Sequence, residues 1–176
     1  MNFTHLHLAI NHSPLYSELF AFGLLVIGLL ARKRTLVTAG LVIAIIAALC
    51  AYAAIWSGDG AAEIIKNSSP PIAGVDKTLI GPHEDAADYF ATSAYITGGL
   101  ALISLIIGWR RGERFRWLDT LIALAVLFSL SIAVRTALLG GRIHHPEERA
   151  VVGQICAPNA LRSGARSSAE MSATTT

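Results

Sequence analysis

The sequence predicts an all-α membrane protein built as a bundle of four transmembrane helices. Of its 176 residues, 53% are hydrophobic and 15% are charged, and the mean hydropathy is +0.55. This combination is typical of polytopic membrane proteins. The apolar residues fall into four runs, each long enough to cross a bilayer. Clusters of arginine and lysine at 32–34 and 110–116 divide these runs into two hairpins.

The first hairpin carries clear helix signals. Its first span begins at Ser13-Pro14, an N-cap residue followed by proline at the first helical position, and it ends at Ala31. Its second span, Thr35–Trp56, ends at a Ser-Gly-Asp-Gly segment. We therefore expect residues 57–81, which are rich in Gly, Ser and Pro, to form a polar connection.

The second hairpin begins with the charged segment 81–88. Pro82 fits the first position of a helix, and the acidic residues behind it fall in the first turn, where the helix dipole favours them. The third span is Tyr89–Trp109. The fourth, Trp117–Leu139, ends at Gly140-Gly141, and this glycine pair predicts the end of the helix.

The distribution of charge predicts the domains and the orientation. Residues 1–145 form a four-span membrane domain with a polar outer cap, and residues 146–176 form an extended tail rich in Ala, Ser and Thr. Because basic residues gather in the two short turns, the positive-inside rule places these turns in the cytoplasm. Both termini and all six histidines then lie on the outer side, the periplasmic face of a bacterial inner membrane.

Height above the membrane groups several polar residues together. Counted at 1.5 Å per residue from the basic turns, His83, His144 and Glu63 each stand roughly 40 Å above those turns, beyond a hydrocarbon core of about 30 Å. His12 lies lower, and His7 is on a segment that can fold over the top of the bundle. We expect His83, His144 and Glu63 to lie within a few ångströms of one another, with His7 or His12 nearby.

Imidazole and carboxylate groups together suit zinc, copper or iron, so this group predicts a transition-metal site or a haem b site. Two axial histidines of a haem need nearly equal heights on facing helices. His83 and His144 meet this condition, whereas His12 and His83 do not. The alternative is that the outer histidines and acids form only a polar, hydrogen-bonded lid.

Two charged residues lie inside the spans, both in the outer third of the bilayer. Because their depths agree, Glu18 and Arg135 predict a structural ion pair that fixes the register of two helices. The alternative is that Arg135 binds a haem propionate or an anionic lipid head group.

No enzyme class is indicated by the motifs. The sequence contains no Walker A, GxSxG, CxxC, CxxCH or Rossmann pattern and no nucleophile–base set. Nucleic-acid binding is not expected, because seven of the basic residues sit in the two cytoplasmic turns.

Four short motifs, each beside a span, carry a resemblance. They are His12-Ser13-Pro14, the segment 58–63, His83-Glu84 and the segment 140–144. Together they resemble an uncharacterised family of bacterial four-helix integral membrane proteins with a histidine-rich outer face, over roughly residues 10–148. The resemblance implies a four-helix membrane fold with a polar outer face and supplies no activity.

Two functions are therefore expected as alternatives. In the first, the chain is a non-catalytic integral membrane subunit of a larger respiratory or photosynthetic electron-transfer complex. Its partners are membrane lipid and protein subunits, which it contacts through its outer face and the tail 146–176, since such a tail buries too little apolar surface to order alone. In the second, the chain is a stand-alone redox protein that binds a metal or haem at a periplasmic histidine and carboxylate site.

Overall fold

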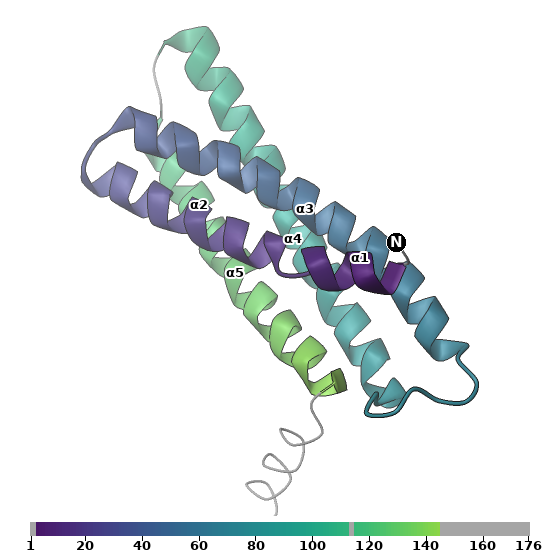
Figure 1. Cartoon of the computed structure of the whole chain (residues 1–176). Coiled ribbons are helices and arrows are strands. Elements are labelled where there is room, and N and C mark those ends of the chain that lie inside the picture. The colour runs from purple at the N-terminus through teal and green to yellow at the C-terminus, as the bar shows by residue number, and fades with distance from the viewer. Residues whose placement is uncertain (1–2, 113–114, 145–176) are drawn as a thin grey trace, which may run out of the picture.

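The computed structural model describes residues 3–112 and 115–144, with only the backbone of His144, so the predicted tail lies outside the described residues. All regular structure in this part of the chain is helical (Figure 1). The elements are α1 (Phe3–Ile10), α2 (Ser13–Leu30), α3 (Arg34–Lys66), the short 3₁₀ helix η1 (Lys77–Leu79), α4 (Ile80–Arg111) and α5 (Arg116–His144).

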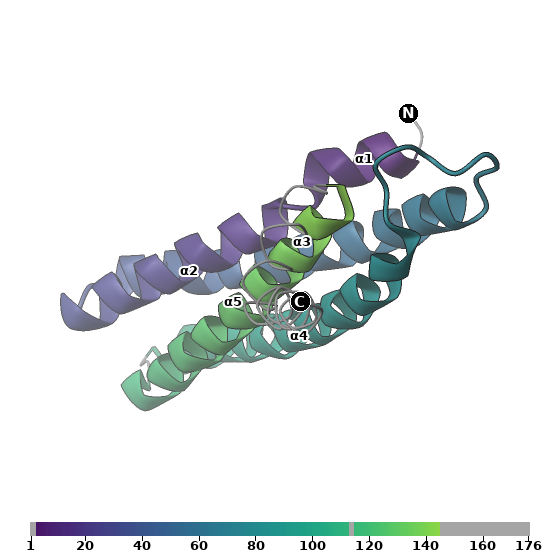
Figure 2. The same ribbon diagram turned by 90° about the horizontal axis from the view of Figure 1, so that it is seen from below.

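The long helices α2 to α5 form a closed ring. Each packs on the next in chain order and α5 packs back on α2, while α1 packs on α3. Figures 1 and 2 show α1, the α3–α4 connection and the end of α5 at one end of this bundle. We call this the histidine end. The opposite end, where α2 joins α3 and α4 joins α5, is the basic end.

The core between the helices is rich in alanine, and many large apolar side chains lie on the outside of the bundle. The fully buried core between the helices includes Ala21, Leu25, Leu41, Ala44 and Ala101. Phenylalanine, leucine and tryptophan side chains are exposed on the outer surface, the reverse of a water-soluble core but a pattern that lipid can solvate. Within the described residues, four helices are long and apolar enough to cross a membrane. The predicted all-α fold with four helices of membrane-crossing length is confirmed for the described residues.

Arginines tie the two hairpins together at the basic end. Gly112, with a left-handed φ of 68°, ends α4. The carbonyl oxygen of Gly112 accepts a hydrogen bond from the Nη1 of Arg34 at 3.3 Å. The carbonyl oxygen of Leu29 accepts a hydrogen bond from the Nη2 of Arg116 at 3.0 Å. These contacts satisfy carbonyl groups that a helix end leaves without an intrahelical partner.

Three helix ends differ from the sequence prediction. Helix α3 continues to Lys66 instead of ending after Trp56, α4 begins at Ile80, and α5 runs through Gly140-Gly141 to His144. A glycine inside a helix costs only about 1 kcal/mol relative to alanine, so tertiary packing can offset it. The longer helices extend past the predicted spans and form the walls of the site at the histidine end.

Candidate functional site

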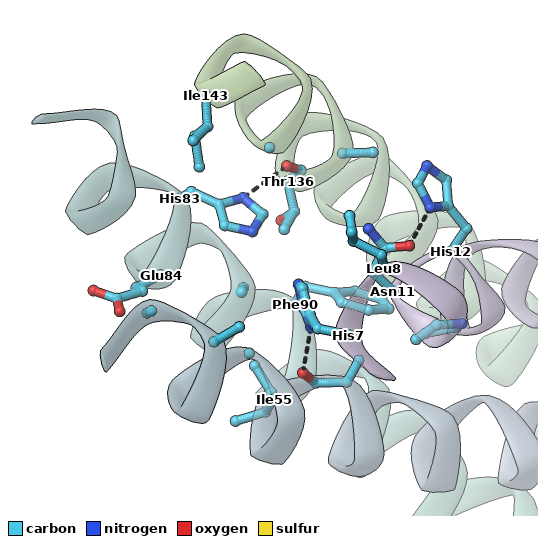
Figure 3. Close-up of a pocket in the computed structure, with 18 of the residues that line it drawn as sticks. His7, Leu8, Asn11, His12, Ile55, His83, Glu84, Phe90, Thr136 and Ile143 are labelled. Atoms are coloured by element: carbon cyan, nitrogen blue, oxygen red, sulfur yellow. Dashed lines mark hydrogen bonds between the residues drawn. The ribbon is translucent and has the colours of Figure 1, made fainter. Parts of the chain in front are cut away.

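A cavity of about 420 Å³ lies at the histidine end, between α1 and the ring of long helices. Much of its wall consists of alanine and glycine, whose small size leaves the space between the helices unfilled. The apolar lining is completed by larger side chains such as Leu8, Ile55 and Phe90. Its polar lining includes His7, Asn11, His12, His83 and Thr136 (Figure 3).

His83 enters the cavity from the first turns of α4. Its Nδ1 lies 3.1 Å from the carbonyl oxygen of Thr136 on α5. A carbonyl oxygen only accepts, so Nδ1 carries the hydrogen and the Nε2 of the neutral ring keeps a free lone pair. Figure 3 shows the ring directed into the cavity, with the hydrogen bond from one ring nitrogen to Thr136 drawn as a dashed line.

His7 enters the same cavity from α1. Its Nδ1 lies 3.2 Å from the carbonyl oxygen of Ala54 and 3.2 Å from the hydroxyl of Ser57, both on α3. The Ser57 hydroxyl itself donates to the Ala54 carbonyl at 3.1 Å. The Nδ1 of His7 therefore donates as well, and its Nε2 is the nitrogen with a free lone pair.

The two rings are held in the same way on different helices. A glycine stands four residues after each accepting carbonyl. A Cβ added at Gly58 would lie 3.1 Å from the Cε1 of His7, and one added at Gly140 would lie 3.0 Å from the Cε1 of His83. In a helix the Cβ of residue i+4 points back over the carbonyl of residue i. Glycine leaves that carbonyl open to a second donor. We call these groups the α3 half-site (His7, Ala54, Gly58) and the α5 half-site (His83, Thr136, Gly140).

Both imidazoles lie beyond the segments needed to cross a hydrocarbon core. About 20 helical residues suffice to cross the core. Counted from Arg34 at the start of α3, that length ends near Ala54, whereas the His7 ring lies one turn further along, against Gly58. His83 lies at the same end, in the first turns of α4. Burial is the largest effect on each ring and lowers its pKa below the ordinary value of 6.5, with the backbone hydrogen bonds opposing it. Both rings are neutral at pH 7.

An ion pair ties α3 to α4 beside the cavity. The Nζ of Lys66 lies 2.8 Å from both carboxylate oxygens of Glu84, which lines the cavity. The Nζ of Lys77 donates to the carbonyl oxygens of Lys66 and Ser68, each at 3.1 Å. These contacts hold the α3–α4 connection over the ends of its two helices.

The structure brings together part of the predicted metal group. His7 and His83 share the cavity, and His12 lies at its edge, exposed and hydrogen-bonded to Asn11. Glu63 is exposed and does not line the cavity, because it falls on the outer side of the extended α3. The side chain of His144 lies outside the described residues. Among the described side chains, no group of three His, Cys, Asp or Glu residues could hold a metal ion.

The predicted pair of Glu18 and Arg135 is not formed. Glu18 is buried, and its Oε1 is hydrogen-bonded to the hydroxyl of Ser129 on α5 at 2.9 Å. Arg135 is exposed on the same helix. Six residues at about 100° each turn Arg135 away from the face of Ser129 and place it about 9 Å further along the helix. Glu18 and Arg135 were predicted to lie at the same height along the bundle, but their side chains do not point toward each other. Arg135 does not line the cavity either.

The half-sites contain residues that sequence reasoning missed. Thr136 belongs to no motif, and Gly58 and Gly140, which begin two of the four short motifs, were interpreted as helix ends. Their common spacing of four residues from an accepting carbonyl becomes visible only with the histidine contacts.

The fold and the site define a class: a four-helix bundle of membrane-spanning type with two neutral imidazoles facing one apolar cavity. Comparison with family models, with curated proteins and with solved structures finds no match to this chain. The resemblance to a bacterial membrane family therefore stays a prediction.

Proposed function

We propose that this chain is a membrane cytochrome of the b type, which binds haem in the cavity through the Nε2 atoms of His7 and His83. One observation carries the proposal. Each ring donates its Nδ1 hydrogen to a helix carbonyl and presents a neutral Nε2 to the same apolar space (Figure 3). Metal-ligating histidines are oriented in this way by a second hydrogen bond, which fixes the tautomer and the direction of the ring.

The donor set favours haem over a bare metal ion. Zinc sites take three or four protein ligands, and copper sites are similarly rich in them. Two of the histidines that line the cavity, His7 and His83, are bonded through Nδ1 to a helix carbonyl, and the described side chains form no group of three donors that could hold a metal ion. A haem brings four nitrogen ligands of its own and needs only axial ligands from the protein. The apolar lining of alanine, isoleucine and phenylalanine suits the faces of a macrocycle.

Two axial imidazoles leave no open position on the iron, so the expected activity is electron transfer and not catalysis on a bound substrate. We further propose that the basic end faces the cytoplasm, as the positive-inside rule requires. The cavity then opens at the periplasmic face of a bacterial inner membrane. A cytochrome of this kind fits the predicted place in a respiratory or photosynthetic electron-transfer complex. The assembly role of residues 146–176 concerns a segment outside the described residues.

The test of haem binding is a titration of the purified protein in mild detergent with haemin. We expect one haem per chain and, after reduction, the sharp absorption bands of a low-spin b-type haem. His7→Ala combined with His83→Ala is expected to abolish binding. His5→Ala is the matched control, because His5 is an exposed histidine on the same short helix and does not line the cavity. Binding that survives the double substitution, or a wild-type protein that takes up no haem, contradicts the proposal.

The orientation is tested separately with a membrane-impermeant maleimide applied to intact cells whose outer membrane has been made permeable. We expect Cys156 to react and Cys50, which lies within α3, to remain unlabelled. Labelling of Cys156 only after the inner face is exposed would reverse the orientation, and the haem titration would be unaffected.

A further inference from the structure

A buried carboxyl group lies directly beneath the cavity and belongs to neither half-site. Glu18 on α2 is 1% exposed. Pro14 and Leu15, one helical turn further out on α2, line the cavity. The floor of the cavity is therefore one turn, about 5 Å, from the level of Glu18.

Two serines connect Glu18 to the cavity floor. The hydroxyl of Ser129 on α5 lies 2.9 Å from the Oε1 of Glu18, and the hydroxyl of Ser93 on α4 lies 3.0 Å from that of Ser129. The Ser93 hydroxyl also lies 2.7 Å from the carbonyl oxygen of Phe90, a residue that lines the cavity. The second oxygen of Glu18, Oε2, has no hydrogen-bond partner among the described residues.

Counting hydrogens distinguishes two states of this chain of contacts. Each hydroxyl has one hydrogen to donate. If Glu18 is ionised, Ser129 donates to Glu18, and the one hydrogen of Ser93 cannot serve both Ser129 and Phe90. If Glu18 is protonated, Oε1 donates to Ser129, Ser129 donates to Ser93, and Ser93 donates to the carbonyl of Phe90. The acid form therefore fills all three contacts.

The surroundings supply nothing to balance a negative charge. The described helices form no ion pair with Glu18, and Ser129 is the only described side chain that is hydrogen-bonded to it. An ionised oxygen without a donor in such an interior is costly, whereas a neutral carboxylic acid leaves only one carbonyl oxygen unpaired.

We propose that Glu18 is a proton-binding site inside the membrane domain, connected to the cavity by Ser129 and Ser93. On release, the proton of Oε1 passes to Ser129, that of Ser129 passes to Ser93, and that of Ser93 passes to a water molecule that enters from the cavity, one helical turn above Ser93 on α4. Glu18 is left as the carboxylate and the two hydroxyls point in the reverse direction. Uptake follows the same route backwards, so each passage moves one proton and breaks no other bond.

The test is infrared spectroscopy of the full-length protein in lipid at neutral pH, without added haem. We expect the C=O stretch of a protonated carboxylic acid, absent in Glu18→Gln and shifted in Ser129→Ala, which removes its hydrogen-bond partner. In heavy water this band should shift as the proton exchanges for deuterium. Ser93→Ala should slow that exchange, because it breaks the connection to the cavity.

Ser131→Ala is the matched control, since Ser131 is an exposed serine on α5 whose hydroxyl bonds only within its own helix. It should leave both the band and its exchange unchanged. A wild-type protein without the band, or a band that Glu18→Gln leaves in place, overturns the proposal. Equal exchange rates in Ser93→Ala and Ser131→Ala overturn the route. Because no haem is present, these outcomes are independent of the haem titration.

Discussion

The two half-sites hold their histidines by the same contacts but on supports of different stiffness. His83 stands on α4, a helix of 32 residues that packs on both α3 and α5. The hydroxyl of Thr136 also donates to the carbonyl oxygen of Ala86 on α4 at 3.0 Å. His7 stands on α1, a helix of eight residues. Beyond the histidine contacts, α1 is held by an edge-on contact of Phe3 with Trp56, with ring centroids 5.3 Å apart.

This difference assigns distinct roles to the two rings. A helix as short as α1 is not stable alone, so its contacts with α3 determine whether it forms. The α5 half-site is carried by two long helices that pack on each other and line the cavity. We expect the α3 half-site to move more readily, because its histidine stands on the short α1.

Removing each histidine in turn gives the largest expected difference. His83→Ala should cost more in haem affinity than the roughly 10–100-fold typical of losing an outer-shell partner. His7→Ala should retain haem on His83 but convert it from six-coordinate low-spin to five-coordinate high-spin iron. Absorption and electron paramagnetic resonance spectra measure both effects. The opposite result, with His83 dispensable and His7 essential, would invert the comparison.

Adding a methyl group to either glycine tests the close approach of the rings. Gly140→Ala should lower stability by about 1–3 kcal/mol, the usual cost of overpacking. Gly58→Ala should cost less, because α1 can move aside. Thermal unfolding in detergent compares the two with Gly99→Ala, where a Cβ meets no atom within 4 Å. That control should be neutral or stabilising by up to about 1 kcal/mol. Equal effects at all three positions would mean that the rings do not press on the glycines.

Acid should weaken the histidine end. Burial lowers the pKa of His7 and His83 below 6.5 in the folded protein, so the unfolded chain binds more protons. The stability from these neutral rings is complete above pH 6.5 and is lost as the pH falls through the lowered values. Thermal unfolding temperatures measured from pH 8 to pH 5 should decline, and the decline should flatten when both histidines are replaced by alanine. An unchanged slope in that variant would place the acid sensitivity elsewhere.

The smallest effect is expected at the ion pair beside the cavity. Lys66 and Glu84 are partly exposed to solvent, and such pairs contribute about 0–1 kcal/mol. Replacing either by alanine should change stability within that range, with a difference that shrinks in high salt. A double-mutant cycle measures the coupling. A coupling well above this range would show that the pair, and not the half-sites, stabilises this end of the bundle.

The sequence predicts the four spans because lipid forces backbone groups to pair within helices, and this makes long apolar runs informative. It predicts their ends less well. Gly58 and Gly140 have the local signature of helix termination, but each lies against a histidine ring from a distant segment. The helix propensity of the neighbouring residues does not predict a contact with a ring that is distant in the sequence.

The sequence predicts His83 at this end of the bundle with His7 or His12 nearby, but it names His144 as the facing imidazole. Residue counting gives height along the bundle, and height favoured His144. The position of His7 depends on the folding of α1 back onto α3, a tertiary contact that no periodicity records. The same limit explains Glu18, because residue counting gives heights along the helices but does not show that Arg135 lies on an exposed face of α5.

In the proposed cytochrome, His7 and His83 face one ligand together. Electron paramagnetic resonance of the haem-loaded wild-type protein, with its histidines labelled with ¹⁵N at the ring nitrogens, measures this arrangement. We expect a low-spin ferric haem whose iron couples to two equivalent imidazole nitrogens, with one coupling lost in His7→Ala. A high-spin signal, or coupling to a single imidazole in the wild-type protein, would contradict it.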